Sequence, residues 1–233
     1  MADNIILRGE LLSKLYLQGE KTIYALRDVS INVKRGEFVM ICGKSGSGKS
    51  TLLNMLSGFD TPTTGKVFID NTDINDAPER EKCRIRNEKI GFVFQSFNLL
   101  PILTAAENIL SPMLIGKREW DKKYFDEVTT KLGIAERLHH LPKELSGGEC
   151  QRVAVARAII GKPSVLFADE PTGNLDKSSS EELIRLLTLA NREFGQTIVM
   201  VTHDESLLPI ADTVYRMTDG EIRNVTDEIK KKL

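Results

Sequence analysis

Residues 43–50 constrain the fold more than any other part of the chain, because this glycine-rich segment joins two elements of different periodicity. Before it stands the continuous apolar run Phe38–Cys42, which is typical of a central strand buried on both faces. After it, residues 51–56 have the pattern of a helix. The sequence therefore predicts a strand, a tight loop and a helix in direct succession, the unit from which parallel sheets covered by helices are built.

The spacing of this loop matches the pattern G-x-x-x-x-G-K-[ST]. Glycines allow such a loop to turn its N–H groups inward, and the helix that follows adds its positive end, so a triphosphate is held largely by main-chain donors. Lys49 is expected to reach the β- and γ-phosphates, and Ser50 to offer its hydroxyl to Mg²⁺. The residues predicted to hold the nucleotide are Gly43, Ser45, Gly46, Gly48, Lys49, Ser50 and Thr51.

A phosphate loop of this kind needs a carboxylate that holds the magnesium ion at the end of a neighbouring strand. Four apolar residues, 165–168, end in Asp169, which we expect to take this role. Glu170 follows at once. With the charge of Asp169 neutralised by the metal, Glu170 is predicted to polarise the water that attacks the γ-phosphate.

Further strands are predicted on both sides of a block with helical periodicity, residues 104–160, and a leucine-rich helix is predicted over residues 179–194. Strands that alternate with helices indicate a mostly parallel sheet with both faces covered. The predicted strands are residues 22–33, 38–42, 67–70, 90–94, 164–169, 197–202 and 213–217.

Composition excludes several classes of protein. The 32 Lys and Arg residues nearly balance 33 Asp and Glu, so the charge does not favour a nucleic-acid partner. The three cysteines have no C-x-x-C spacing, which argues against a disulfide framework or a zinc site. No apolar run approaches the roughly 18 residues that span a bilayer, and the first residues do not form a secretory signal. We therefore expect a cytoplasmic protein.

Residues 145–149, Leu-Ser-Gly-Gly-Glu, and the run Cys-Gln-Arg-Val-Ala-Val-Ala-Arg-Ala that follows resemble the signature of ATP-binding cassette (ABC) ATPases. Ser-Gly-Gly at a helix start is itself an anion site, since it offers free amides, a hydroxyl and a helix dipole. In that family the signature of one subunit closes over the γ-phosphate held by another in a head-to-tail dimer. The resemblance implies this role in trans for Ser146, Gly147 and Gly148. Glu149 stands where the family usually has Gln.

Other segments resemble cassette motifs in the family's order. Gln95 is similar to the glutamine that reaches Mg²⁺ and the attacking water. Residues 172–176, Thr-Gly-Asn-Leu-Asp, resemble the loop that crosses the dimer interface, and this assigns Asp176 to the nucleotide site. His203 matches the histidine that contacts the γ-phosphate and supports the catalytic glutamate. Tyr16 resembles the aromatic residue that stacks on adenine, although Tyr24 competes for that role.

The resemblance also implies a domain plan: an α/β P-loop NTPase with a mostly parallel central sheet, an N-terminal antiparallel β part and an inserted helical subdomain. Residues 1–233 would form a single ABC ATPase domain. Residues 1–95 and 161–233 would make its nucleotide-binding core, and residues 96–160 the helical subdomain with the signature.

The amino-acid sequences of residues 92–109 and 172–176 resemble those of the subgroup of lipoprotein-release, macrolide-efflux and bacitracin-resistance ATPases. ATP and Mg²⁺ are the implied cofactors. The implied partners are a second copy of the chain and a permease with a large extracytoplasmic domain, which would hold the protein at the inner face of the membrane. Phe97, Leu99 and Leu100 are predicted to line the groove that receives the permease, unless they pack in the core of the helical block.

Three other functions are weighed against this one. A soluble cassette of the iron–sulfur assembly type would bind protein partners without a membrane. A DNA-repair cassette would bind nucleic acid in a salt-sensitive way, which the near-neutral charge disfavours. A P-loop GTPase would need an Asn-Lys-x-Asp motif, and the sequence has none.

Overall fold

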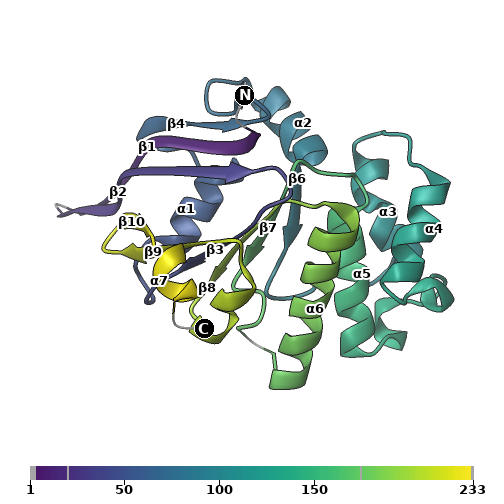
Figure 1. Cartoon of the computed structure of the whole chain (residues 1–233). Coiled ribbons are helices and arrows are strands. Elements are labelled where there is room, and N and C mark those ends of the chain that lie inside the picture. Colours follow the sequence, from purple (N-terminus) through teal and green to yellow (C-terminus); the bar gives the residue numbers. More distant parts are fainter. Residues whose placement is uncertain (1–3, 20, 174, 232–233) are drawn as a thin grey trace.

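The computed structural model describes residues 4–19, 21–173 and 175–231, which form two sheets and a set of helices (Figure 1). An antiparallel sheet has the strand order β2-β1-β4-β5, and a six-stranded sheet has the order β10-β9-β3-β8-β7-β6. The strands are β1 (Ile5–Gln18), β2 (Lys21–Lys34), β3 (Phe38–Cys42), β4 (Thr64–Ile69), β5 (Thr72–Asp73), β6 (Ile90–Val93), β7 (Val165–Asp169), β8 (Ile198–Thr202), β9 (Thr213–Thr218) and β10 (Glu221–Asn224). The α-helices are α1 (Lys49–Leu56), α2 (Glu79–Lys89), α3 (Ala105–Ile115), α4 (Lys122–Lys131), α5 (Gly147–Ile159), α6 (Lys177–Phe194) and α7 (Thr226–Lys230), and short 3₁₀ helices are η1 (Ala135–Arg137), η2 (Pro142–Glu144) and η3 (Glu205–Ile210).

The larger sheet is parallel except at one edge, where β10 pairs antiparallel with β9. Its register brings several strand ends to the same level: Cys42 of β3 lies opposite Thr202 of β8, and Asp169 of β7 lies opposite Val201. Because parallel strands finish at one edge, the loops that follow β3, β7 and β8 meet there. This register gathers the predicted site residues.

Side chains of the central strands alternate between two hydrophobic clusters, one on each face of the sheet. Phe38, Met40 and Cys42 of β3 pack with helices α3, α5 and α6. Val39 and Ile41 point the other way and pack with α1 and with the antiparallel sheet. The chain therefore has three layers, with α1 held between the two sheets and the helical block on the opposite face (Figure 1).

The fold class is as the sequence and the resemblance predicted, and the seven predicted strands are all present with shifts at their ends. Phe94 lies outside β6, whose pairing with β7 ends at Val93. Helix α6 begins two residues earlier than predicted, because Asp176 caps it by accepting from the Ser179 backbone N–H. The residue patterns of the sequence analysis did not predict strands β1, β5 and β10 or helix α2. Strand β1 was missed since several register shifts interrupt its pairing with β2 and with it the alternation of side chains.

Asp70 was predicted to end a strand, and this was wrong. It has φ 48° and Asn71 has φ 62°, so the two residues form the tight turn between β4 and β5. Its carboxylate accepts hydrogen bonds from Arg35 Nη2 at 2.8 Å, from Lys89 Nζ at 3.0 Å and from the Ser164 hydroxyl. Asp70 thus ties β2, β4, α2 and the start of β7 together.

The helical block begins at a capping box, in which the Thr104 hydroxyl accepts from the Glu107 backbone N–H and the Glu107 carboxylate accepts in return. Its three α-helices, α3, α4 and α5, bury one apolar face in the same cluster as α6. Among the described residues, no helix combines the length and the apolar character that crossing a bilayer requires.

We expect Asp70→Asn to lower the free energy of unfolding by about 1–3 kcal/mol at pH 7, because Asn keeps the turn but removes the charge. Burial raises the pKa of Asp70, but the hydrogen bonds from Ser164, Lys89 and Arg35 outweigh it, so this pKa lies below the ordinary 3.8. A carboxyl with a lowered folded pKa stabilises above its unfolded pKa, and loses that contribution as the pH falls through the folded value.

Urea denaturation at pH 7 and at pH 3 measures this difference. The gap between the two proteins should be full at pH 7 and should shrink below pH 3.8. Asp76→Asn is the matched control, because that carboxylate is 74% exposed and pairs only with Lys66 in the described structure. An equal loss of stability at both pH values would contradict the role given to the charge of Asp70.

Candidate active site

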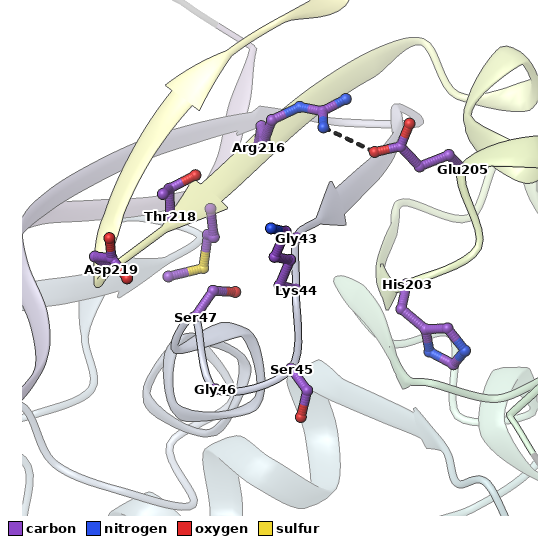
Figure 2. Close-up of a pocket in the computed structure, with 11 residues that line it drawn as sticks. Gly43, Lys44, Ser45, Gly46, Ser47, His203, Glu205, Arg216, Thr218 and Asp219 are labelled. Carbon is purple, nitrogen blue, oxygen red and sulfur yellow. Dashed lines mark hydrogen bonds and ion pairs between the residues drawn. The ribbon is translucent and has the colours of Figure 1, made fainter.

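The glycine-rich loop after β3 lies at the mouth of a cavity of about 610 Å³ (Figure 2). Gly48 has φ 101°, and a Cβ there would lie 2.5 Å from the carbonyl oxygen of Ala25, so only glycine fits this close approach. Gly46 has φ 79° and faces open space. The loop places five of its residues around the cavity, namely Gly43, Lys44, Ser45, Gly46 and Ser47.

Lys49, the first residue of α1, points back into this loop. Its side chain is only 5% exposed, and Nζ donates to the carbonyl oxygens of Gly43 at 2.9 Å and Lys44 at 3.0 Å. Glu170 Oε1 lies 3.6 Å from the same nitrogen. A buried ammonium group held by neutral carbonyls, with one carboxylate nearby, is placed to exchange these partners for phosphate oxygens.

Ser50 and Asp169 bring two oxygen ligands together at the end of β7. Ser50 Oγ donates to Asp169 Oδ1 at 3.1 Å. Burial is the main cause that raises the pKa of Asp169 above 3.8; Ser50 and Lys49 act against it, and the charge of Glu170 adds to it. Desolvation therefore disfavours the ionised form of this carboxylate.

Glu170 turns out of the line of β7. It has φ 40°, a left-handed conformation that is costly for a residue with a side chain, and its N–H donates to Val201 O at 3.1 Å. This turn aims the carboxylate at two partners: Lys49, and His203, whose Nδ1 lies 2.9 Å from Glu170 Oε2. His203 follows β8 and borders the cavity beside the loop (Figure 2). The structure therefore brings together Lys49, Glu170 and His203, which are far apart in the sequence.

Gln95 follows β6 and lines a second cavity, of about 500 Å³, with Ser50, Asp169 and Glu170. A Cβ at Gly173 would lie 2.8 Å from Gln95 Nε2, so the amide packs against the turn that follows Glu170. Phe59, Phe92 and Phe94 also line this cavity, and the last two stack with their centroids 4.5 Å apart. The sequence analysis missed this aromatic wall. Phe59 has no motif around it, so only its position after α1 could have suggested it.

Tyr16 and Tyr24 lie on the β1–β2 hairpin but on opposite faces of it. Leu15 pairs with Tyr24 and Tyr16 with Ile23, and side chains of directly paired residues share a face. The Tyr16 hydroxyl donates to Asp60 Oδ2 at 3.0 Å. Burial, followed by Asp60, raises the pKa of Tyr16, whereas Lys14 and Thr51 of α1 act in the opposite direction. Tyr24 is covered on one ring face by the Arg27 guanidinium, 4.6 Å from the centroid.

Ser146, Gly147 and Gly148 form the start of α5, away from both cavities of the phosphate loop. Ser146 is the N-cap, and a Cβ on either glycine would meet nothing within 4 Å, so this helix end is open. Asp176 caps α6 and lines neither cavity. Asn174, in the same predicted loop, lies outside the described residues. The start of α1 and the start of α5, which the sequence analysis predicted to bind phosphate, are therefore separate in one chain.

The segment after Gln95 is tied to α5. Arg157 donates from Nη1 to Asn98 O and from Nη2 to Phe97 O, both at 2.7 Å. Leu99 packs against the core of the helical block, whereas Leu100 is 45% exposed. Ile102, which the sequence analysis did not single out, is 84% exposed. Of the three residues predicted to line a docking groove, only Leu100 is exposed, whereas Phe97 and Leu99 are partly buried.

The chain matches the ABC transporter family over residues 26–173. It is 46% identical to an uncharacterized ABC transporter ATP-binding protein, MJ0796, of Methanocaldococcus jannaschii, covering 91% of this chain and 92% of that protein. It is 41% identical to the lipoprotein-releasing system ATP-binding protein LolD of Francisella tularensis, covering 96% and 98%. The macrolide export ATP-binding/permease protein MacB of Syntrophobacter fumaroxidans is 44% identical over 91% of this chain, which spans 30% of that protein.

A solved structure agrees with these matches. The dimeric post-hydrolysis state of the cassette MJ0796, bound to ADP and Pi, superimposes with a TM-score of 0.79 at 42% identity. The match covers 94% of this chain and 97% of that one.

We expect Tyr16→Ala to weaken ATP binding about tenfold, since stacking of a base on an aromatic ring contributes roughly 1–3 kcal/mol. The reason is the position of Tyr16 on the hairpin face that reaches Thr51 of α1. Tyr24→Ala is the matched control and should change the affinity less than about twofold, because its ring faces the other side and stacks with Arg27. Calorimetric titration with ATP measures both; the reverse order would assign the base to Tyr24.

Proposed function

The chain belongs to the ABC transporter family and is an ATPase of that family, and from this premise we propose that it powers a membrane permease by closing head-to-tail with a second copy when ATP binds. One observation carries the proposal: the phosphate loop and the Ser146–Gly148 helix end lie apart in the chain, so neither alone surrounds a triphosphate. Two copies in opposite orientation would complete two sites. The dimeric structure of the similar cassette MJ0796 supports this arrangement.

Mg²⁺ fits the residues at the end of β7. Ser50 Oγ and Asp169 Oδ1 are hard oxygen donors 3.1 Å apart, and the Asp169 carboxylate is partly buried at the end of β7. Mg²⁺ in nucleotide sites is commonly held by one or two such protein ligands together with phosphate oxygens and water. We assign Ser50 and Asp169 as its ligands, and Gln95 lines the same cavity. The bound ion would neutralise charge on the phosphates.

Hydrolysis requires a base beside the γ-phosphate, and Glu170 takes this role in the proposal. Its carboxylate lies 3.6 Å from Lys49 Nζ, the group that is to bind the γ-phosphate, so it stands next to the reacting phosphorus. Glu170 accepts a proton from the attacking water, and His203 at 2.9 Å holds the carboxylate in orientation. Lys49 leaves the carbonyls of Gly43 and Lys44 to stabilise the charge on the transferred phosphoryl group.

Bound ATP then holds the two copies together, because both copies contact it. The amides of Gly147 and Gly148 and the Ser146 hydroxyl bind the γ-phosphate held by the partner, in the open space at the start of α5. Asp176 lies at the first turn of α6, where the resemblance places the interface. Cleavage of the γ-phosphate and release of the products remove these contacts, so the dimer opens.

The names of the relatives support a permease as the partner of this chain. LolD is named for lipoprotein release, and MacB for macrolide export with ATP-binding and permease parts in one protein. We propose that this chain works with a permease that has an extracytoplasmic domain, at the inner face of the membrane, in export of or resistance to a lipoprotein, drug or antimicrobial peptide. The iron–sulfur assembly alternative has no counterpart among these relatives. Leu100 and Ile102 are exposed apolar residues in the segment after Gln95, and we propose that they receive the permease.

We expect Glu170→Gln to slow ATP hydrolysis by about 10²–10⁴-fold, because the amide cannot accept the proton. ATP binding should be retained, and the variant should elute as a dimer in Mg²⁺ and ATP but as a monomer without nucleotide. Phosphate release and light scattering during gel filtration measure the two effects. Lys49→Ala is the control that should not dimerise. A Glu170→Gln protein that stays monomeric at saturating ATP would contradict the proposal.

We expect Ile102→Ser to reduce stimulation of the ATPase by the permease at least threefold, while basal hydrolysis stays unchanged. The measurement uses the complex purified from membranes through a tag on this chain, compared with the isolated chain. Leu17→Ser is the matched control, because Leu17 is 82% exposed but lies on the hairpin of β1. Equal stimulation of both variants would rule out the docking surface, and association with soluble proteins only would favour the iron–sulfur alternative.

A further inference from the structure

The start of α5 carries a negative charge where a phosphate is to bind. Glu149 closes a capping box: its Oε2 accepts from the Ser146 backbone N–H at 2.8 Å and from Ser146 Oγ at 2.9 Å. The Ser146 backbone N–H, then Arg137, lower the pKa of Glu149 to about 2, so the carboxylate is ionised at neutral pH. This box stabilises the helix, yet it occupies the Ser146 hydroxyl and places an anion in the first turn.

Arg137 holds the other oxygen of this carboxylate. It comes from the 3₁₀ helix η1, and its Nε donates to Glu149 Oε1 at 2.8 Å. The Arg137 side chain is 44% exposed and that of Glu149 25% exposed. Within residues 4–19, 21–173 and 175–231, no other Lys, Arg or His forms an ion pair with Glu149. The two carboxylate oxygens of Glu149 thus have different partners: Oε2 accepts from Ser146, and Oε1 accepts from Arg137.

These contacts bear on the phosphate site because the same atoms serve both. A γ-phosphate that approaches the amides of Gly147 and Gly148 comes close to the Glu149 carboxylate, and two anions at short range repel. The Ser146 hydroxyl must also leave Oε2 to donate to the phosphate. A cation on Oε1 reduces the repulsion, and it draws electron density away from the oxygen that Ser146 has to release.

We propose that Arg137 is a positioning residue for the phosphate site in trans: it neutralises Glu149 and fixes its carboxylate, so that the start of α5 accepts the γ-phosphate held by the partner copy. The proposal rests on the head-to-tail dimer of the proposed function. Arg137 itself does not touch the nucleotide. It acts through Glu149, the residue that replaces the family's usual Gln, and a neutral side chain at position 149 would remove the need for it.

The test measures the dimer dissociation constant at saturating Mg²⁺ and ATP in the Glu170→Gln background. Arg137→Met keeps the length of the side chain and removes the charge. We expect it to weaken the dimer about tenfold, since a partly exposed pair of this kind contributes a factor of about three at each of two signatures. The effect should shrink in 1 M salt, because the repulsion is screened.

Rescue separates this role from a merely structural one. In the double variant Arg137→Met with Glu149→Gln, the dimer should return to within about twofold of the background protein, because the charge to be neutralised is gone. Thermal unfolding without nucleotide should not follow this pattern. Arg185→Met is the matched control: Arg185 pairs with Glu182 at 2.8 Å on α6, and its loss should leave dimerisation unchanged.

The outcomes discriminate between the two proposals. A Glu170→Gln protein that does not dimerise with ATP overturns the proposed function itself. If that protein dimerises but Arg137→Met does not weaken the dimer, or if Glu149→Gln fails to restore it, the role of Arg137 is overturned and the proposed function stands.

Discussion

The parallel register of three strands is the constraint on which the site depends. Because β3, β7 and β8 end at one edge of the sheet, the loops that carry Lys49, Glu170 and His203 meet without any long excursion of the chain. The central strands are buried on both faces, and a slip by one residue would exchange the side chains that pack in the two hydrophobic clusters and spoil the fit of both. The register that packs the core is therefore also the register that places Lys49, Glu170 and His203 together.

Electrostatics at the site are arranged for a ligand that brings its own negative charge. Lys49 is buried among carbonyl oxygens, burial raises the pKa of Asp169, and Glu170 has a left-handed backbone conformation between Lys49 and His203. Each of these arrangements costs stability in the free chain, and in the proposed function bound phosphates and Mg²⁺ would offset that cost. The start of α5 differs, because the Glu149 carboxylate already lies in its first turn and Arg137 neutralises that charge.

Much of this could be predicted from the sequence, since apolar runs and short motifs are local. The loop at residues 43–50, the Asp169–Glu170 pair and the central strands need only neighbouring residues. The pairing of Glu170 with His203 was expected only through the family resemblance, because no local pattern joins two residues so far apart. The network around Asp70 could not be predicted, and the sequence left open whether Leu99 is buried, since both depend on tertiary packing. Strand β1 was hidden by its irregular register, and the face on which Tyr16 lies follows only from pairing with β2.

The two hydrogen bonds from Arg157 have a mechanical consequence. They attach the carbonyls of Phe97 and Asn98 to α5, the helix that begins after Ser146. The segment beside the exposed Leu100 and Ile102 therefore cannot move relative to α5 without breaking hydrogen bonds of the Arg157 guanidinium. A displacement of either segment is therefore passed to the other through the Arg157 side chain. In the proposed function, this link would couple movement of the permease to the helix end that binds the partner's nucleotide.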